Sequence, residues 1–372
     1  MGYIGHIDVM NDFEISGWAS DNKVRKKRVS VDIIISGKHV VTCKARGFRD
    51  DLLAAGVSDG YSSFSYSSKE SFDIANNNIQ ILFSGTRISV PREKTDSEKK
   101  KRFENYIFPI LKCIACESRQ LDLGDGKITC GECGKEYTVN NHIPIMVLDP
   151  DMEKICSYSN DVVAKTSYSD ELTELIMKYE RGPVLDLGSG YNSNVFPDLG
   201  TVKLDIFPFP NVDVVGYGEN LPFKPGTFEA IISMSAFEHV QNPFLLVHSI
   251  KQTLAPGGEL YTETAFLQPV HAYPNHYFNM TKQGLEYLCS DFEKIQSGVH
   301  FHQLPSFTLN WILKSWSKKL NGKNKEDFLN LTVREILEEY RYNLFSKRWM
   351  GDFSTEDMEE LACGIYFHGR KV

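Results

Sequence analysis

Residues 184–190, VLDLGSG, constrain the fold of this chain more than any other stretch. The apolar residues of the run suit a strand that is covered on both faces, as in a parallel sheet. Gly188 and Gly190 then allow a tight turn and a close approach of the backbone to a ligand. Asp186 lies inside the apolar run, where a carboxylate is costly to bury, so we expect it to bond turn amides or a ligand.

Helical and strand patterns alternate from about residue 160 onwards. The expected elements are a helix over 172–179, strands over 184–187, 202–206, 212–215 and 228–234, a helix over 244–254 and a strand over 259–264. This alternation predicts a doubly wound α/β domain over 151–372. Ligands of such a sheet bind at the carboxyl ends of its strands.

Two cofactors fit the glycine turn. A dinucleotide motif needs a third glycine, but Ser193 stands at that position, which removes the close helix approach expected around a pyrophosphate. Asp205 ends the second strand and could accept both ribose hydroxyls of either cofactor. The turn by itself therefore leaves the choice open.

Four downstream segments resemble, in order and spacing, those of small-molecule class I S-adenosylmethionine-dependent methyltransferases of the type 11-like kind. They are ENLPF at 219–223, FEAI at 228–231, EHV at 238–240 and LAPGG at 254–258. The resemblance covers roughly residues 160–300 and implies S-adenosylmethionine as cofactor. The residues that it assigns to cofactor binding are Asp186, Gly188, Ser189 and Gly190 in the turn, Asp205 at the ribose, Asn220 and Leu221 at the adenine, and Ser235.

Two positions depart from that family's pattern. Tyr217 stands where many members place an acidic residue for the adenine amino group, so stacking or backbone groups would hold adenine here. About a dozen residues, Pro197 among them, join Gly190 to the second strand. The first crossover helix is therefore expected to be short or absent.

Three histidines are candidates for the base that deprotonates the acceptor. His239 follows the fourth strand, and His271 and His276 follow the fifth in FLQPVHAYPNHYFNMT. A hydroxyl nucleophile needs a base, and imidazole titrates in the useful range. The loop resembles the acceptor loop of methyltransferases encoded with polysaccharide genes. Loop packing is the alternative role, and a divalent metal held by two histidines and Glu263 is a less favoured one.

Two C-x-x-C pairs, Cys113 with Cys116 and Cys130 with Cys133, are separated by thirteen residues. Four sulfurs on two short knuckles predict a closed, tetrahedral, structural zinc site, whereas a catalytic zinc needs an open position. Residues 105–150 resemble the small zinc ribbon that acts as an activator subunit of tRNA methyltransferases. Redox or idle thiols are the alternative.

Residues 1–92 show short alternating segments separated by turns, which predicts a β-sandwich of about seven strands with a hairpin at Ser36-Gly37. Gly17-Trp18-Ala19 and the later Ala45-x-x-x-Arg49-x-Asp51-Leu52 resemble an accessory β domain found with enzymes of bacterial surface glycans. A packing or dimerisation module without a ligand is the favoured interpretation. Residues 93–104 are polar and charged, which predicts a linker.

The C-terminal region is expected to contain a helical insertion or lid at 305–352, because 361–371 is typical of the sheet's closing strand. An amphipathic helix is predicted from Val333 to Leu344. Trp311, Trp316 and nearby lysines could contact a membrane surface, but a lid or homo-oligomer contact is favoured. His300 and His302 alternate on an expected strand and are assigned a structural role.

The chain has 372 residues and a formal net charge of −8, which argues against a nucleic-acid partner held by a broad positive field. No apolar run is long enough to span a bilayer and no signal peptide is evident, so a cytoplasmic protein is expected.

The expected function is O-methylation of a sugar in a surface glycan or glycan precursor, with His271 or His276 as base. RNA base methylation is an alternative, because ribosomal RNA guanine methyltransferases also join a zinc ribbon to this fold. A non-catalytic scaffold with a degenerate methyltransferase domain is the third.

Overall fold

The computed structural model divides the chain into two compact units, which are described separately. The first comprises residues 1–234 and 248–262, and the second comprises 235–247 and 263–372. The structure describes residues 3–21, 24, 26–74, 76–86, 88–92, 95–148, 168, 170–179, 182–190, 201–209, 211–271, 275–339, 344, 349, 353–363 and 370. The predicted short crossover around Pro197 and most of the predicted closing strand lie outside these residues.

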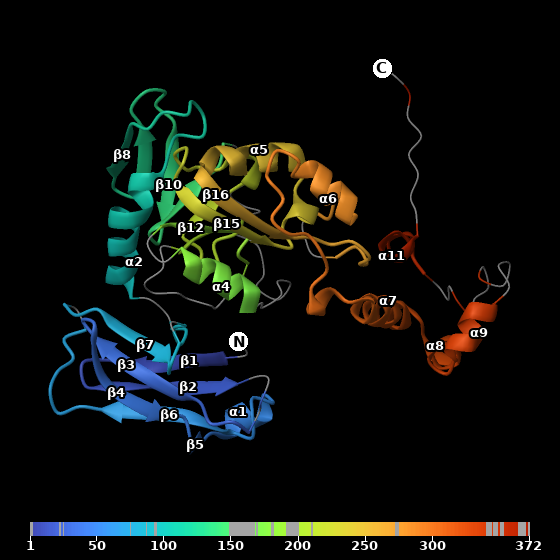
Figure 1. Ribbon diagram of the computed structural model, residues 1–372, viewed down its shortest axis with the longest axis horizontal. Coiled ribbons are helices and arrows are strands. Elements are labelled where there is room, and N and C mark those ends of the chain that lie inside the picture. The colour runs from blue at the N-terminus through green and yellow to red at the C-terminus, as the bar shows by residue number, and fades with distance from the viewer. Residues whose placement is uncertain are drawn as a thin grey trace. The chain divides into compact units, whose positions relative to one another are not determined.

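Residues 3–83 form two antiparallel sheets, shown in blue in Figure 1. One contains β1 (Tyr3–Met10), β2 (Glu14–Asp21), β6 (Tyr61–Ser67) and β5 (Gly47–Phe48), and the other contains β4 (Lys38–Lys44), β3 (Ser30–Ile35) and β7 (Ile79–Phe83), with the short helix α1 (Asp50–Ala54) between β5 and β6. Buried side chains from both sheets share one core cluster, as in a sandwich. Ser36 and Gly37 both have positive φ, 47° and 80°, which confirms the predicted hairpin turn.

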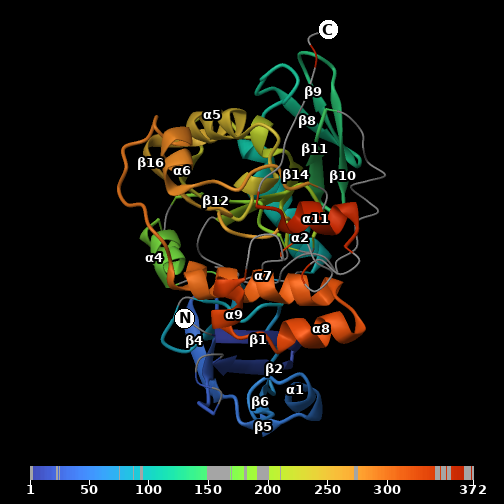
Figure 2. The same cartoon turned by 90° about the vertical axis from the view of Figure 1, so that its right-hand side faces the viewer.

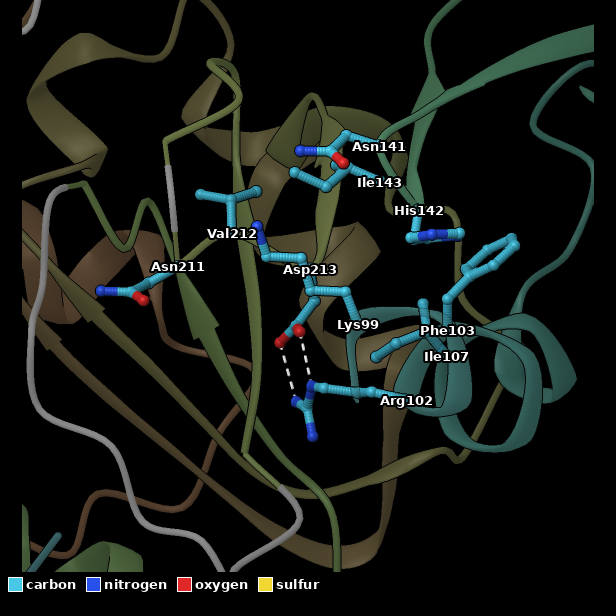
Figure 3. Close-up of a pocket in the computed structure, with 10 residues that line it drawn as sticks. All are labelled: Lys99, Arg102, Phe103, Ile107, Asn141, His142, Ile143, Asn211, Val212 and Asp213. Atoms are coloured by element: carbon cyan, nitrogen blue, oxygen red, sulfur yellow. Dashed lines mark hydrogen bonds and ion pairs between the residues drawn. The ribbon is translucent and has the colours of Figure 1, made fainter. Parts of the chain in front are cut away.

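Residues 96–102, predicted to belong to an unpacked linker, form helix α2 (Asp96–Arg102), followed by the turns η1 (Phe103–Ile107) and η2 (Phe108–Ile110). The Thr95 side chain accepts the Glu98 N–H in a capping box. Arg102 donates to both carboxylate oxygens of Asp213, at 2.6 and 2.8 Å, as Figure 3 shows. The linker prediction is wrong because the charged run contains a cap and an arginine whose partner lies 111 residues away.

The cysteine-bearing segment is built from β8 (Leu121–Gly124), β9 (Lys127–Cys130), β10 (Glu136–Asn140) and β11 (Ile143–Met146). The first three strands are antiparallel, and β11 is antiparallel to β10. On its other side β11 pairs in parallel with β14, Ile145 opposite Val215. The cysteine segment is therefore continuous with the central sheet.

The central sheet contains β12 (Val184–Leu187), β13 (Thr201–Asp205), β14 (Val214–Gly216), β15 (Phe228–Met234) and β16 (Leu254–Glu263). Helix α4 (Asp170–Lys178) precedes β12, and α5 (Pro243–Thr253) lies between β15 and β16. The full order is β16-β15-β12-β13-β14-β11-β10-β9-β8. Strand β12 is parallel to both β13 and β15. The chain moves outward from β12 through β13 and β14 and returns to β15 on the other side, so the carboxyl end of β12 is the topological switch point.

The second unit contains the turn η5 (Phe237–His239), α6 (Lys282–Leu288), η6 (Phe301–Gln303), α7 (Pro305–Lys319), α8 (Gly322–Leu329), α9 (Val333–Glu338) and α11 (Thr355–Leu361). Leu320, Phe328 and Trp349 form a small core between α7 and α8, which run side by side in Figure 2. Lys319 Nζ bonds Asp357 at 2.6 Å and Glu360 at 2.7 Å, which ties α7 to α11. In the part of the chain that the structure describes, no helix is long and apolar enough to cross a bilayer.

Three predictions for this unit are corrected. His300 is the N-cap of a 3-10 turn and His302 lies within that turn, so the two do not alternate on a strand. A capping box between His300 and Gln303 stabilises the turn. The predicted amphipathic helix ends at Glu338, and Val333 and Leu337 are 69% and 80% exposed. Leu361, the predicted start of the closing strand, is the last residue of α11.

Candidate active site

The glycine turn after β12 is bonded to the end of β13. Gly188 and Gly190 have φ values of 70° and 54°, a region in which side chains are strained, so glycine is required by the backbone. The Gly188 N–H donates to the Leu204 carbonyl at 2.9 Å, and the Gly190 N–H donates to Asp205 Oδ2 at 2.8 Å. The turn predicted from VLDLGSG is present at the switch point.

Asp205 is a buried carboxylate at the position predicted for the ribose ligand. Its Oδ1 accepts the Phe207 N–H at 3.0 Å, while Oδ2 accepts the Gly190 N–H. Burial raises the pKa of Asp205 to about 6, although these two donors lower it. Each carboxylate oxygen can accept more than one hydrogen bond, so Asp205 can hold the turn and still accept from a ligand hydroxyl.

Asp186 is bonded to a phenol rather than to turn amides. The Tyr168 hydroxyl donates to its carboxylate, and Lys203 Nζ lies 5.9 Å from the Tyr168 ring centroid. Burial raises the pKa of Asp186, and the charge of Lys203 opposes that shift. Tyr168 was missed by sequence reasoning, because no motif surrounds it.

Ser189 and Ser233 carry buried hydroxyls near the switch point. Neither Oγ has a hydrogen-bond partner among the described residues. A buried polar group in that state is costly, and a ligand hydrogen bond would remove the cost. Ser189 follows the first glycine of the turn, so it is suitably placed in the chain to meet a ligand of the turn.

The residues assigned to adenine lie in and after the turn η4 (Gly218–Asn220). Asn220 Nδ2 donates to the Ile114 carbonyl at 3.1 Å, which ties the turn to the first cysteine knuckle. Leu221 is buried, and its N–H donates to Ser249 Oγ at 2.9 Å. Tyr217 is 44% exposed.

Ser235, the first residue after β15, is exposed and has a φ of 54°. Its N–H donates to the Glu263 carbonyl at 2.9 Å. It belongs to the second unit, as do the three candidate histidines.

His239, His271 and His276 are brought together in the second unit. Their ring centroids are 5.4, 5.2 and 4.6 Å apart, and one ligand nitrogen from each lies within 4.8 Å of the others. The backbone N–H groups of Tyr277 and Phe278 donate to the Glu238 carbonyl at 2.7 and 3.2 Å, which holds the loop against η5. We call these three residues the histidine cluster.

One ring nitrogen of each histidine in the cluster faces a protein oxygen. The pairs are His239 Nδ1 with the Asn275 carbonyl at 2.7 Å, His271 Nδ1 with the Pro269 carbonyl at 2.9 Å, and His276 Nε2 with Asn279 Oδ1 at 2.9 Å. These oxygens accept, so the ring nitrogens donate, and the other nitrogen of each neutral imidazole carries a lone pair. At His276 that nitrogen, Nδ1, accepts the His271 N–H at 3.4 Å, a long bond that a proton or a ligand would replace. Burial lowers the pKa of both His239 and His271.

Glu238 is fully buried beside the cluster and was not among the predicted site residues. Its Oε2 accepts from Thr264 Oγ1 at 2.9 Å, whereas Oε1 has no hydrogen-bond partner in the described part of the chain. Burial raises its pKa, and positive charge on His271 and His276 opposes the shift. The EHV segment was the only signal that could have pointed to it.

Glu263, considered above as a metal ligand with two of these histidines, has other partners. Its carboxylate accepts from His302 Nε2 at 2.7 Å and from Gln303 Nε2 at 3.0 Å. Glu238, which directly precedes His239, is therefore the carboxylate to consider with the histidine cluster.

Cys113, Cys116, Cys130 and Cys133 converge as the spacing predicted, with their sulfurs within 4.8 Å of one another. Cys113 and Cys133 Sγ are 3.6 Å apart, as are those of Cys116 and Cys130. Sulfurs bound tetrahedrally at about 2.3 Å from zinc are about 3.8 Å apart, so the four fit that ion.

The cysteine cluster is supported by hydrogen bonds from the surrounding backbone and one phenol. The Tyr137 hydroxyl lies 3.0 Å from Cys113 Sγ and accepts the Ile114 N–H at 3.1 Å. The backbone N–H of Cys133 lowers the pKa of Cys130 to about 6. Such donors stabilise thiolates, the form in which cysteine binds a metal.

A family model described as a methyltransferase domain matches residues 185–262, which include the glycine turn and Asp205. A curated relative is a tRNA U34 carboxymethyltransferase of Campylobacter curvus, 28% identical over 122 residues. The match covers 28% of this chain and 41% of that protein, so the chain spans less than half the length of this relative.

Solved structures show partial likeness. An N-methyltransferase of Haemonchus contortus in complex with S-adenosylhomocysteine is 13% identical, with a TM-score of 0.28 over 49% of this chain and 48% of that one. A Haloferax volcanii complex of the Trm112 methyltransferase activator with a putative methyltransferase is 20% identical, with a TM-score of 0.25 over 30% of this chain and 60% of that one.

Proposed function

We propose that this chain, which carries a methyltransferase domain of the S-adenosylmethionine-dependent kind over residues 185–262, methylates a hydroxyl group. The observation that carries the proposal is the glycine turn at the switch point, bonded to a buried carboxylate at the end of the neighbouring strand. A nucleoside cofactor at such a position meets backbone, carboxylate and hydroxyl groups together.

The residues that would hold S-adenosylmethionine are those of the turn and its surroundings. Gly188 and Gly190 admit the ligand close to the backbone, and Asp205 accepts from ribose hydroxyls. The buried Ser189 hydroxyl, which has no hydrogen-bond partner among the described residues, gains one. Asn220 and Leu221 remain the proposed adenine contacts, with Ser235 as a further contact. The cofactor supplies a methyl group on a sulfonium whose leaving group is a neutral thioether.

The histidine cluster is the proposed acceptor site. His239 follows β15 in the chain, and His271 and His276 follow β16, so all three come from segments that leave the carboxyl ends of central strands. Methyl transfer to a hydroxyl oxygen releases a proton. His271 or His276 accepts that proton at the ring nitrogen that carries the lone pair.

A sugar hydroxyl of a surface glycan or glycan precursor is the proposed acceptor. The support is the resemblance of the N-terminal sandwich and of loop 266–281 to proteins of glycan biosynthesis, together with the net charge of −8. A negative protein repels a polyanion but not a neutral sugar. We place the reaction in the cytoplasm, where the cysteine cluster would stay reduced.

RNA methylation is the second candidate, and the curated relative favours it, because that protein is named as a tRNA carboxymethyltransferase. The acidic balance of this chain opposes it, since phosphate contacts supply much of the affinity for nucleic acid. The two candidates share the cofactor site and differ only in the acceptor.

For the cysteine cluster we propose structural zinc. The sulfur separations fit the ion, and all four positions of a tetrahedron are taken by protein. This metal would stabilise the fold of residues 113–140 and take no part in the reaction.

Calorimetry with S-adenosylmethionine tests the cofactor site. We expect binding to the full chain and a loss of at least about tenfold in affinity for Asp205→Ala, because a charged acceptor is removed. Asp125→Ala, in the exposed turn between β8 and β9, is the matched control. Equal affinity of both variants would show that Asp205 does not hold the cofactor, and a wild-type protein without affinity would leave the scaffold alternative.

Labelled methyl transfer identifies the acceptor. The full chain is incubated with radiolabelled S-adenosylmethionine and a cell extract, which is then split between glycosidase and nuclease digestion. We expect the label to become soluble on glycosidase treatment. Label that becomes soluble with nuclease alone would show that the acceptor is RNA rather than a glycan.

A further inference from the structure

The histidine cluster has the arrangement of a metal site in addition to that of a base. One nitrogen from each of His239, His271 and His276 lies within 4.8 Å of the others. Nitrogens bound tetrahedrally to zinc at about 2.0–2.1 Å are about 3.4 Å apart, so each would move inward by about 0.8 Å or less. Small side-chain rotations supply a movement of that size.

The outer hydrogen bonds of the three rings are those that orient metal ligands. A ligating imidazole donates its second N–H to a carbonyl, carboxylate or other acceptor, which fixes the tautomer and turns the lone pair toward the ion. Here the carbonyls of Asn275 and Pro269 and the amide oxygen of Asn279 each engage one ring. Asn279 is itself oriented, because its Nδ2 donates to the Gln268 carbonyl at 2.9 Å.

Glu238 is the independent observation that points to a cation. It is fully buried, and its Oε1 has no hydrogen-bond partner among the described residues. A carboxylate is costly to bury in this state unless positive charge lies close by. Glu238 directly precedes His239, and its carbonyl accepts the N–H groups of Tyr277 and Phe278 at 2.7 and 3.2 Å. It therefore belongs to the same contact between η5 and the loop that brings the three rings together.

We propose that His239, His271 and His276 bind a divalent transition-metal ion, with Glu238 compensating its charge. Neutral imidazole suits zinc, iron, copper and nickel, whereas magnesium and calcium prefer oxygen ligands. Three protein ligands leave a fourth position for an oxygen of water or substrate, which is the arrangement of catalytic zinc. Zinc is therefore the ion to test first.

The site follows from the second unit alone, whereas its part in the reaction rests on the proposed function. With the ion bound, the imidazole lone pairs are used for coordination, and the three histidines are ligands rather than bases. An ion held by the three histidines would lower the pKa of a substrate hydroxyl at its fourth position, so that the proton could pass to solvent. The oxygen could then attack the methyl group, and the cofactor would leave as the neutral thioether.

Metal content separates this site from the cysteine cluster. The full chain is stripped with a chelator under reducing conditions, reloaded with Zn²⁺ and desalted, and zinc is counted per chain. We expect two ions in the wild type and one in the double variant His239→Ala/His271→Ala. His248→Ala is the matched control, because that histidine is exposed on α5 and bonds Gln252 on the same helix, and this variant should keep two ions.

Cobalt substitution identifies the ligands of each ion. Thiolate ligands give Co²⁺ intense charge-transfer absorption, and imidazole ligands do not. We expect the second equivalent of Co²⁺ to add visible bands without charge transfer, and these bands to be absent from the double variant. One ion per wild-type chain, or two in the double variant, overturns the proposal, and the wild-type count decides even if the variant fails to fold.

Failure of this inference is distinguishable from failure of the proposed function. Two ions per chain without affinity for S-adenosylmethionine would keep the metal site and remove methyl transfer. One ion per chain with methyl transfer that withstands chelation would keep the function, with a histidine as base, and remove the metal site.

Discussion

The cysteine cluster and the histidine cluster are two candidate metal sites built in opposite ways. The four cysteines lie within 21 consecutive residues on two knuckles of one small antiparallel sheet. The three histidines come from η5 and a loop more than thirty residues further on. In the first cluster four protein sulfurs would fill all four coordination positions of an ion, whereas three histidines would leave the fourth position open.

This difference predicts different consequences of losing the ion. A small sheet with few buried side chains depends on its metal for folding free energy. The histidine cluster is held by backbone hydrogen bonds to the Glu238 carbonyl and by packing of His271 on Trp311, whose ring centroids are 4.9 Å apart. Its shape therefore does not need the ion. We expect metal to determine folding at one site and chemistry at the other.

The largest effect is expected from Cys113→Ser. Structural zinc supplies on the order of 10 kcal/mol of folding free energy in small zinc domains, so strands β8, β9 and β10 should lose their hydrogen-exchange protection. His271→Ala, which removes one ligand of the other cluster, should leave that protection intact. Full protection in Cys113→Ser would show that the cysteine segment folds without its metal.

A smaller effect is expected from Asn279→Ala. Loss of the partner that orients His276 should weaken binding of the second zinc ion about 10- to 100-fold and leave the first unchanged. A competition titration with a zinc-binding dye measures both affinities. Asn330→Ala is the control, because the side chain of Asn330 is exposed and donates to the Glu326 carbonyl of the preceding helix. Unchanged affinity would mean that the outer hydrogen bonds do not support a metal ligand.

The glycine turn extends the comparison to a site that is proposed to bind a cofactor without metal. Because burial raises the pKa of Asp205 to about 6, the ionised acceptor is present above that pH and is lost as the pH falls through it. Affinity for S-adenosylmethionine should therefore drop about tenfold between pH 7 and pH 5, measured by calorimetry. The folding stability of the cofactor-free protein should change with pH in the opposite direction. The raised pKa of Asp205 stabilises the folded state below about pH 4, and this contribution is lost as the pH rises above about 6. A flat affinity profile would contradict the role of the carboxylate.

The smallest effect is expected from Tyr137→Phe. The hydroxyl that contacts Cys113 Sγ and accepts the Ile114 N–H is removed, which should cost about 1 kcal/mol of unfolding free energy while zinc is retained. Denaturant unfolding with a metal count on the same sample measures both. Loss of zinc from this variant would place Tyr137 among the groups that hold the metal.

Local patterns predicted the parts of the molecule that local residues determine. VLDLGSG predicted strand β12 and its turn, FEAIISM coincides with β15, and the spacing of the cysteines predicted their convergence. Each of these depends on the period of buried residues or on the short reach of two knuckles.

The features that were missed depend on partners distant in sequence. Arg102 donates to Asp213, and Tyr168 donates to Asp186. Asn220 donates to the Ile114 carbonyl in the cysteine segment. Glu238 belongs to the EHV segment but was assigned no role, because its Oε1 is buried without a hydrogen-bond partner among the described residues, which no spacing reveals. Charge alone misled the prediction for residues 93–104, since a solvated run and a capped helix have the same composition.

The parallel pairing of β11 with β14 means that the cysteine segment also covers an edge of the central sheet. Strand β14 is entirely buried and apolar, with the sequence VVG, and without β11 its outer hydrogen-bonding edge would be open to another chain. If the proposed zinc ion stabilises the segment that covers this edge, thiol reduction and zinc supply would affect the solubility of the protein. Chains that emerge under oxidative stress or zinc starvation would expose the edge and associate through it before any chemistry is lost.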